Sequence, residues 1–392
     1  MQILFLSNWY PYPPSNGSKL RIYNLLRALA QHHDVTLLTF ADQQDIGSEK
    51  PTLSKLCREI QVVPRKSFSP SSWRARRGFL SKAPRSVVDT FSSDMEQRIR
   101  QTLNARNYDV VIASQEGTAG YSYCFQGITA IFEEVEIGVP YERFAYATSA
   151  WQRFRYGLTW IKHRRYLAYL LRDFQACTVV STREQNLLTK VTPDHQAIEV
   201  IPNCIDLADY GGVKGPPQWN HLIFTGSFRY FANYEGMTWF LQDIFPRIQA
   251  RVPDVQLTIT GDHAGLPLPA VNNVILTGFV DDVRPLIASA SISLVPLRVG
   301  GGTRLKILEA MALGTPVVTT SKGAEGLDVE PGKHLLIADT PSAFAEAIIL
   351  LLSESRLRQQ VVDNAYQLVC QKYDCAAVMP QFLSLIDRVA TG

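Results

Sequence analysis

The sequence predicts an α/β protein built from two doubly wound domains. Short apolar runs alternate with helical patterns through the first half of the 392 residues, as expected for parallel sheets covered by helices. The alternation stops at a segment rich in Pro and Gly, residues 201–217, and then starts again. Because the length is sufficient for two ordinary domains, we expect one domain at residues 1–205 and a second at 206–374.

Each predicted strand is a short run rich in β-branched and other apolar residues. In the first domain these runs are residues 3–6, 35–40, 62–63, 110–113, 130–132 and 178–180. In the second they are residues 221–225, 256–260, 274–276, 292–295, 317–320 and 335–337. Helical spacing of apolar residues predicts helices at 19–31 and 239–251, and a mostly helical tail from Phe344 onward.

Composition and charge are those of an ordinary globular protein. The chain is 46% hydrophobic and 19% charged, so disorder is not expected. A net charge of +3 argues against a nucleic-acid partner. The six cysteines include no C-x-x-C pair, which indicates neither a zinc site nor a redox motif, and suggests reduced thiols in a cytosolic protein.

The N-terminus and the hydropathy pattern bear on location. The first eight residues lack a basic segment and fit a first strand better than a signal peptide. No run approaches the roughly 20 apolar residues of a membrane span. We therefore expect a cytoplasmic protein.

The most informative segment is residues 299–319, Val-Gly-Gly-Gly-Thr-Arg-Leu-Lys-Ile-Leu-Glu-Ala-Met-Ala-Leu-Gly-Thr-Pro-Val-Val-Thr. It predicts a glycine loop, a helix beginning near Thr303, a left-handed cap at Gly314 and a strand. A helix start offers unpaired N–H groups, and Arg304 and Lys306 add charge, so the segment suits a diphosphate. An ordinary loop–helix–strand unit is the alternative.

This segment resembles the donor-site element of retaining glycosyltransferases of the family-four, or group 1, type. There, two glutamates separated by seven residues precede Ala-Met-Ala-x-Gly-x-Pro-Val-Val. Glu309 matches the second glutamate, and Gly301 stands in place of the first. A subset of the family has the same Gly-Gly-Gly-Thr-Arg-Leu-Lys variant, so this departure does not by itself indicate an inactive enzyme.

The resemblance extends over nearly the whole chain. Matching segments occur in the family's order at residues 13–17, 201–206, 224–227 and 277–280. The resemblance implies the GT-B fold, in which two Rossmann-like domains face each other across a cleft. It also implies an acceptor-binding first domain, a donor-binding second domain, and a C-terminal helix, about residues 375–392, that packs back on the first.

The resemblance also implies the site residues. Glu309 would bind the ribose, while Arg304 and Lys306 would neutralise the diphosphate. The full set of expected donor-binding residues is Gly17, Gly226, Ser227, Arg229, Phe279, Val280, Gly301, Gly302, Thr303, Arg304, Leu305 and Glu309. Simpler roles remain open: a turn for Gly17, solvated charges for Arg229 and Lys306, a Glu309–Lys306 surface pair, and core positions for Phe279 and Val280.

An acceptor-side group is harder to identify. Glu134 or Glu136 follows a predicted strand and could orient or deprotonate the acceptor hydroxyl. A solvated acidic loop is the alternative, since in retaining transfer the leaving phosphate can itself act as the base. Asp281 and Asp282 are expected to begin a helix rather than to bind metal, so neither a metal nor another cofactor is predicted.

Two stretches of the first domain combine basic and aromatic residues. Residues 65–85 hold seven cations and no acid, and residues 151–172 hold six cations among several aromatic rings. Such faces suit an anionic membrane surface or a lipid-phosphate acceptor. A solvated helix face with its rings in the core is one alternative, and an RNA-binding surface is another.

The sequence therefore predicts a metal-independent, retaining glycosyltransferase, peripheral on the inner face of the membrane. It would move a hexose from a nucleotide-diphosphate sugar to a hydroxyl acceptor, a lipid-linked glycan in exopolysaccharide or cell-envelope synthesis. A nucleotide-sugar 2-epimerase of the same fold is an alternative. A catalytically silent donor-binding subunit is another, because the first glutamate of the motif is absent.

Overall fold

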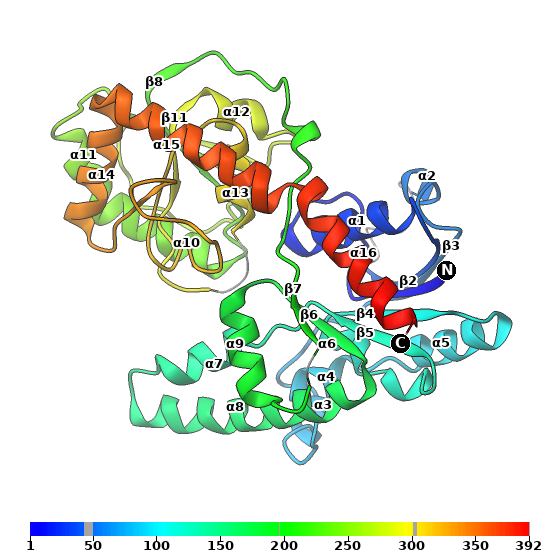
Figure 1. The fold of residues 1–392 in the computed structure, drawn as a ribbon. Coiled ribbons are helices and arrows are strands. Elements are labelled where there is room, and N and C mark those ends of the chain that lie inside the picture. The colour runs from blue at the N-terminus through cyan, green and yellow to red at the C-terminus, as the bar shows by residue number, and fades with distance from the viewer. Residues whose placement is uncertain (43–49, 196, 301–303, 392) are drawn as a thin grey trace. The chain divides into compact units, whose positions relative to one another are not determined.

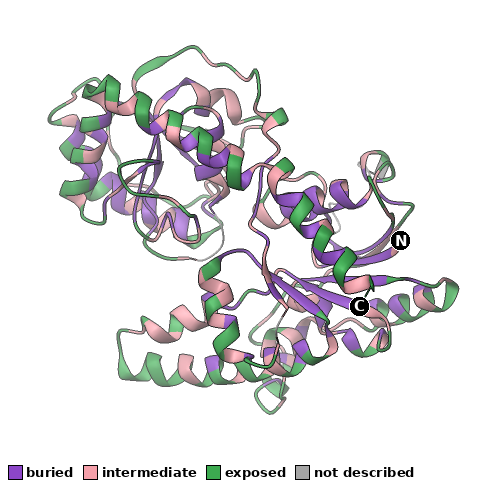
Figure 2. Ribbon diagram, in the orientation of Figure 1, coloured by how far each residue is buried: buried purple, intermediate pink, exposed green. Residues whose placement is uncertain are grey.

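The computed structural model describes residues 1–42, 50–195, 197–300 and 304–391, which form two compact units (Figure 1). The first unit comprises Met1–Asn203 together with Met379–Gly392, and the second comprises Cys204–Val378. Each unit has its own sheet and its own buried core, coloured purple in Figure 2.

The first unit contains a seven-stranded sheet in the order β3-β2-β1-β4-β5-β6-β7. Its strands are β1 Gln2–Ser7, β2 Asp34–Ala41, β3 Glu59–Pro64, β4 Val110–Ser114, β5 Thr129–Glu133, β6 Ala176–Val179 and β7 Ile198–Val200. The described ladders are parallel, as predicted. Chain order runs outward in both directions from the β1/β4 pair, so the loops after these two strands flank a topological switch point.

Helices pack around this sheet (Figure 1). They are α1 Gly17–Leu29, α2 Lys50–Leu53, α3 Trp73–Arg77, α4 Arg85–Thr90, α5 Ser93–Ala105, α6 Glu116–Ala119, α7 Gly138–Ala145, α8 Ala150–Leu170 and α9 Thr182–Val191, with the end of α16, Cys375–Thr391. Helix α1 begins two residues before its predicted start because the Asn16 side chain accepts a hydrogen bond from the N–H of Lys19 at 3.0 Å.

A buried ion pair ties α1 to the sheet. Nε of Arg21 lies 2.6 Å from Oε1 of Glu133, and the two side chains are 2% and 0% exposed. Arg21 Nη1 also donates to the Ile201 carbonyl at 2.8 Å and to Asn203 Oδ1 at 2.9 Å. The second oxygen of Glu133 accepts from the Ser114 hydroxyl at 2.6 Å. One ion pair thus joins α1, β4, β5 and the segment that leaves the first unit.

The second unit contains a six-stranded sheet in the order β10-β9-β8-β11-β12-β13. Its strands are β8 Gln218–Thr225, β9 Gln256–Thr260, β10 Val274–Gly278, β11 Ala290–Val295, β12 Val317–Thr319 and β13 Leu336–Ile337. Its helices are α10 Phe231–Trp239, α11 Phe245–Gln249, α12 Arg284–Ser289, α13 Leu305–Ala312, α14 Pro341–Ser353 and α15 Ser355–Leu368. Packed aromatic rings, including Phe240 against Phe245 and Phe344, fill part of its core.

The helix predicted at residues 239–251 is confirmed as far as Gln249, but the helical stretch already begins at Phe231 and is not a regular α-helix throughout. Trp239 ends α10, residues Phe240–Ile244 form a π-helical segment, and α11 follows. Pro246 has no N–H to donate to the backbone hydrogen bonds of a continuous α-helix. The helix therefore widens into a π-helical turn before α11 continues it. By contrast, the left-handed cap predicted at Gly314 is confirmed, with φ of +72°.

The Arg21–Glu133 pair gives a stability prediction. Arg21→Met should leave a carboxylate buried without its cation, which costs about 3–5 kcal/mol of unfolding free energy. The double variant Arg21→Met/Glu133→Leu should recover most of that loss. Urea unfolding of the wild type, both single variants and the double variant measures the coupling. Additive effects of the two substitutions would contradict a direct pair.

Candidate active site

The site in the second unit begins where α13 follows the glycine loop. Arg304 occupies the N-cap position and is buried, and its Nη2 donates to the Gly300 carbonyl at 2.8 Å. Gly300 has φ of +98°, and a Cβ there would lie 2.1 Å from the Tyr230 hydroxyl. Arg304 therefore binds the loop that precedes its own helix. The predicted residues Gly301, Gly302 and Thr303 lie outside the described part of the chain.

Lys306 projects from the first turn of α13 toward the loop after β8. Its Nζ donates to Asn233 Oδ1 at 3.0 Å and lies 4.3 Å from the centre of the Phe224 ring. Burial, reinforced by Arg304 and opposed by Glu309, lowers the pKa of Lys306 to about 7. A Cβ at Gly226 would lie 2.9 Å from this ammonium, so a glycine is what permits the approach.

The loop that receives Lys306 is held by its backbone. The Gly226 N–H donates to the Thr260 carbonyl at 3.0 Å, and Asn233 Nδ2 donates to the Ser227 carbonyl at 2.8 Å. A Cβ at Gly261 would lie 2.6 Å from the Gly226 backbone. Gly226 and Gly261 thus let their two loops approach each other. As a result, loop backbone lies close to the Lys306 ammonium.

Arg229 lies on this loop but faces solvent. Its side chain is 75% exposed and ion-paired with Asp262. The pKa of Asp262 is lowered mainly by a hydrogen bond from the Ala264 backbone and, to a smaller extent, by the hydrogen bond from the Arg229 side chain. The structure brings Arg229 near Ser227, yet its charge is already directed to a carboxylate.

Glu309 lies one turn after Lys306 on α13. Its Oε1 accepts a hydrogen bond from the Tyr210 hydroxyl at 3.1 Å. Burial raises the pKa of Glu309, while Tyr210 and Lys306 oppose the shift. Lys306 bonds to Asn233 instead, so the simple Glu309–Lys306 pair weighed as an alternative is not among the described contacts.

Sequence reasoning missed Tyr210 and Arg284. Tyr210 lies in the linker, where proline and glycine gave only a turn signal, and burial raises its pKa. Arg284 bonds to Asp282 at 2.8 Å and also to the Asp209 carbonyl, and its charge favours the ionised form of Glu309. Only the fold brings these two residues to the Glu309 carboxylate.

The acidic pair after β10 has a structural role. Asp282 accepts a hydrogen bond from the backbone N–H of Arg284 at 3.0 Å, at the start of α12, as predicted. In the described ranges, no three His, Cys, Asp or Glu side chains gather in a way that could hold a metal ion.

The predicted base-binding residues follow the edge strand β10. Phe279 is 73% exposed, so its alternative role as a core residue is wrong. Val280 and Leu305 are half-buried. An exposed ring at the carboxyl end of a parallel sheet is available for stacking against a flat ligand.

Two predicted residues lie in the first unit. Gly17 is the first residue of α1. Glu134 follows β5 with φ of +57°, and its Oε2 accepts from Gln115 Nε2 at 2.8 Å. Burial raises the pKa of Glu134 to about 8, opposed mainly by Arg21. Gln115 was not predicted, although it directly follows β4 and also accepts from Trp9 Nε1 at 3.0 Å.

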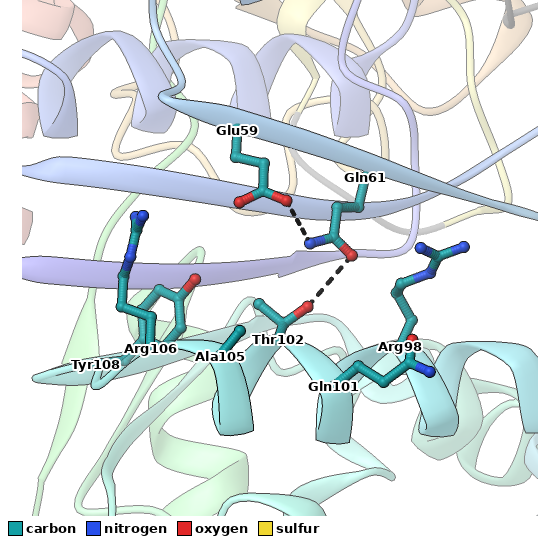
Figure 3. A pocket seen from close by; sticks show the side chains of 8 residues that line it. All are labelled: Glu59, Gln61, Arg98, Gln101, Thr102, Ala105, Arg106 and Tyr108. Carbon is teal, nitrogen blue, oxygen red and sulfur yellow. Dashed lines mark hydrogen bonds between the residues drawn. The ribbon is translucent and has the colours of Figure 1, made fainter.

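A separate hollow of about 230 Å³ lies between β3 and α5 (Figure 3). Gln61 bridges Glu59 and Thr102 by hydrogen bonds of 2.7 and 3.2 Å. Glu59 begins β3, so this hollow is at the opposite end of the sheet from Glu134. It is not part of the candidate site.

Comparison with known families accounts for this arrangement. Residues 220–354 match the family model described as Glycosyl transferases group 1, and residues 15–209 match Glycosyltransferase Family 4. The chain is a group 1 glycosyltransferase. The enzyme family therefore agrees with the resemblance carried by Glu309 and its surrounding motif.

Relatives of this glycosyltransferase include characterised and uncharacterised proteins. An uncharacterized 44.6 kDa protein in the cps region of Klebsiella pneumoniae is 22% identical, covering 96% of this chain and 97% of its own length. The phosphatidyl-myo-inositol mannosyltransferase of Mycobacterium leprae is 30% identical over 51% of this chain and 54% of its own length.

A solved structure confirms the GT-B fold of this glycosyltransferase. The Anabaena protein HepE, crystallised with UDP-glucose, superposes with a TM-score of 0.68. The match covers 99% of this chain and 100% of HepE at 16% sequence identity. At that identity the likeness establishes the fold alone.

Glu309 gives the first test of the site. Glu309→Ala should weaken donor binding by about 1.5–3 kcal/mol, the range for a lost hydrogen bond to a charged group. Tyr210→Phe should weaken it less, because the carboxylate stays but loses its orienting partner. Donor KM and circular dichroism measure both, with Glu346→Ala, an exposed glutamate of the same unit, as control. Unchanged donor KM in folded Glu309→Ala would remove the ribose assignment.

Lys306 gives a pH prediction. Its pKa of about 7 means that the ammonium is fully charged only below neutral pH. A bound diphosphate favours the charged form, so donor affinity should be full below pH 7 and fall by up to about tenfold per unit above it. Calorimetry with a nucleotide sugar measures this slope, and Lys306→Arg should flatten it. A pH-independent wild-type affinity between about pH 6 and 9 would contradict the assignment.

Proposed function

We propose that this glycosyltransferase is a retaining hexosyltransferase that uses a nucleotide-diphosphate sugar and needs no metal ion. A lipid-linked glycan of exopolysaccharide or cell-envelope synthesis is the proposed acceptor. The observation that carries the proposal is the placement of Lys306 and Glu309 on successive turns of α13, beside the glycine loop after β8.

The donor diphosphate would lie at Lys306. Departure of the nucleotide leaves negative charge on the diphosphate while the anomeric carbon becomes positive. The Lys306 ammonium, only 2.9 Å from the position of a Cβ on Gly226, can neutralise that charge close to the loop backbone. Its partly desolvated setting strengthens the interaction relative to one in water. A fixed cation in this position supplies what a metal ion supplies elsewhere.

The ribose would bind Glu309. Tyr210 holds one carboxylate oxygen at 3.1 Å, so the carboxylate is oriented before the ligand arrives. A carboxylate accepts hydrogen bonds from two neighbouring hydroxyl groups, as a ribose ring presents. The exposed Phe279 ring offers a surface for the base. The UDP-glucose bound by HepE supports a nucleotide-sugar donor.

The acceptor hydroxyl would be oriented by Glu134. With a pKa of about 8, this carboxyl group is mainly protonated at neutral pH. It can therefore donate a hydrogen bond to the acceptor, while the departing phosphate takes the acceptor proton. Its fixed hydrogen bond to Gln115, at 2.8 Å, keeps the group in place.

A peripheral membrane surface is proposed on the first unit. Trp151, Phe154, Leu158 and Ile161 recur along one face of α8 and are exposed, with Trp151 at 69%. Lys162 of the same helix donates to the Gly78 carbonyl, so the loop after α3, with Leu80 at 95% exposure, lies against α8. The two sequence segments thus form one surface.

The charges on this surface are fewer than the sequence count suggests. Lys66 is ion-paired with Asp89 at 3.0 Å and Arg65 with Asp42 at 3.1 Å. Arg85 keeps its charge but is tied to the Ala75 carbonyl at 2.9 Å. Arg76 and Arg77 are exposed, and the Arg77 guanidinium lies over the Trp73 ring. In the described ranges, no helix is long and apolar enough to cross a bilayer. An interfacial attachment through apolar side chains and arginines is what we propose.

Transfer itself tests the proposed function. UDP-, GDP- and ADP-hexoses should be screened with octyl glycosides as acceptors, and the product examined by NMR. We expect one donor to be used, the anomeric configuration to be kept, and the rate to survive EDTA. An inverted product, or activity that EDTA abolishes and magnesium or manganese restores, would contradict the mechanism. Epimerisation without nucleotide release would favour the 2-epimerase.

The membrane surface is tested separately. Changing Arg74, Arg76 and Arg77 to Ser should weaken binding to phosphatidylglycerol vesicles by roughly 10- to 100-fold, since each cation near an anionic leaflet contributes about 1 kcal/mol. Donor hydrolysis should be unchanged. The control changes three exposed arginines of the second unit, Arg247, Arg251 and Arg356, to Ser. Wild-type protein that ignores these vesicles at low salt would indicate a soluble acceptor.

A further inference from the structure

A second polar cluster lies in the first unit beside Glu134. Helix α6 begins directly after Gln115 and carries Glu116, and the long helix α8 carries His163. Nδ1 of His163 lies 3.6 Å from Oε1 of Glu116, although the two residues are far apart in sequence. His163 is only 7% exposed. The donor chemistry proposed above uses neither residue.

Three buried polar atoms of this cluster have no hydrogen-bond partner among the described residues. They are Oε1 of Glu116, Nε2 of His163 and Oε2 of Glu184. Glu184 lies on α9 and joins the cluster through Glu136, whose charge raises the pKa of both glutamates and whose backbone bonds to His163. Leaving a buried polar atom unsatisfied costs roughly 1–3 kcal/mol. Native structures seldom retain several such atoms together unless a ligand or water completes them. The unsatisfied atoms therefore favour a polar ligand at this cluster.

The protonation states of the three side chains indicate which chemical groups the ligand carries. Burial lowers the pKa of His163 to about 4, so its imidazole is neutral and offers one donor and one acceptor. Burial, with the nearby Glu136 charge, raises the pKa of Glu116 to about 8 and of Glu184 to about 7. These groups both donate and accept hydrogen bonds near neutral pH. Such a mixture matches hydroxyl groups, which also do both.

The position of the cluster links it to transfer. Glu116 is the residue after Gln115, and Gln115 holds the Glu134 carboxyl group at 2.8 Å. Gln115 has φ of +68°, a left-handed turn that separates the end of β4 from α6. Glu116 and Glu134 thus follow adjacent strands at the carboxyl edge of one sheet. A group bound at Glu116 would be part of the molecule that reaches Glu134.

We propose that Glu116, His163 and Glu184 form a subsite for neighbouring hydroxyl groups of a sugar in the acceptor, and so determine which acceptor is used. This inference rests on the proposed transferase function. A hydroxyl group of that sugar accepts from the protonated carboxyl group of Glu116 and donates to the unpartnered Nε2 of His163. The N–H of the neutral imidazole is directed to the Glu136 backbone. A second hydroxyl reaches Glu184. The acceptor is therefore a glycan end, rather than a lipid alcohol without a sugar.

The test compares acceptors that differ only in this feature. Octyl glucoside, octyl galactoside and octyl mannoside present ring hydroxyls, octyl glucosaminide adds an ammonium group, and octanol has no sugar. Wild-type enzyme should use at least one neutral octyl glycoside and should not use octanol. Glu116→Ala should raise the KM of that glycoside at least tenfold, with little change in kcat. Glu116→Gln, whose amide still donates and accepts hydrogen bonds, should retain part of the affinity.

Donor hydrolysis without acceptor separates this subsite from the donor site. The hydrolysis rate should be the same in Glu116→Ala, in Glu184→Ala and in the wild type. The matched control is Glu96→Ala on α5, where Glu96 is bound to Arg100 at 3.0 Å. If Glu116→Ala does not fold, Glu184→Ala still tests the subsite, because it should raise the same KM. Saturation-transfer NMR with the corresponding methyl glycoside provides a binding readout that needs no donor.

The outcomes are distinct. Wild-type transfer combined with an unchanged acceptor KM in Glu116→Ala and Glu184→Ala overturns the subsite but leaves the transferase function standing. Use of octyl glucosaminide alone overturns the hydroxyl assignment in favour of an ammonium ligand. Transfer to octanol as readily as to the glycosides also overturns it. Absence of nucleotide release with every donor, despite methyl-glycoside binding that Glu116→Ala abolishes, contradicts the proposed function and leaves the sugar site intact.

Discussion

The buried ion pair between Arg21 and Glu133 is the constraint on which the first unit depends. It fixes the end of β5, and with it the direction in which the chain leaves the sheet. Glu134, the next residue, adopts φ of +57° and turns its carboxyl group toward Gln115. The same guanidinium binds the carbonyl of Ile201 and the side chain of Asn203, where the chain leaves this unit. Removing one charge would therefore disturb both the edge of the sheet that carries Glu134 and the start of the linker.

The second unit handles charge differently. Lys306 and Glu309 share one helix face, but each is bound by an uncharged partner, Asn233 for the ammonium and Tyr210 for the carboxylate. Burial shifts the pKa of each toward its neutral form. Under the proposed donor assignment, a diphosphate at Lys306 and a ribose at Glu309 would each stabilise the charged form of its residue. The stability that this pair gives up by being held near neutrality would then contribute to donor affinity.

The sequence was sufficient for the fold and for part of the site. Runs of β-branched residues and the motif from Val299 to Thr319 are local signals, so strands, the Gly314 cap and Glu309 could be read directly. Tyr210, Arg284, Gln115 and His163 could not, because each is brought to its partner by long-range packing and has no local pattern. Local signals also have a limit, as the π-helical segment before Pro246 shows. Apolar periodicity alone does not distinguish a continuous α-helix from one with a widened turn.

The division of the chain has a consequence for how such enzymes diversify. Each unit holds its own core, and the residues expected to contact donor and acceptor belong to different units. Recombination between relatives could therefore exchange one half of the substrate pair and keep the other. The boundary is not a single cut, because residues 379–392 return to the first unit and Arg388 binds Glu199 there at 2.7 Å. A viable chimaera must therefore take residues 1–203 and 379–392 from the same parent.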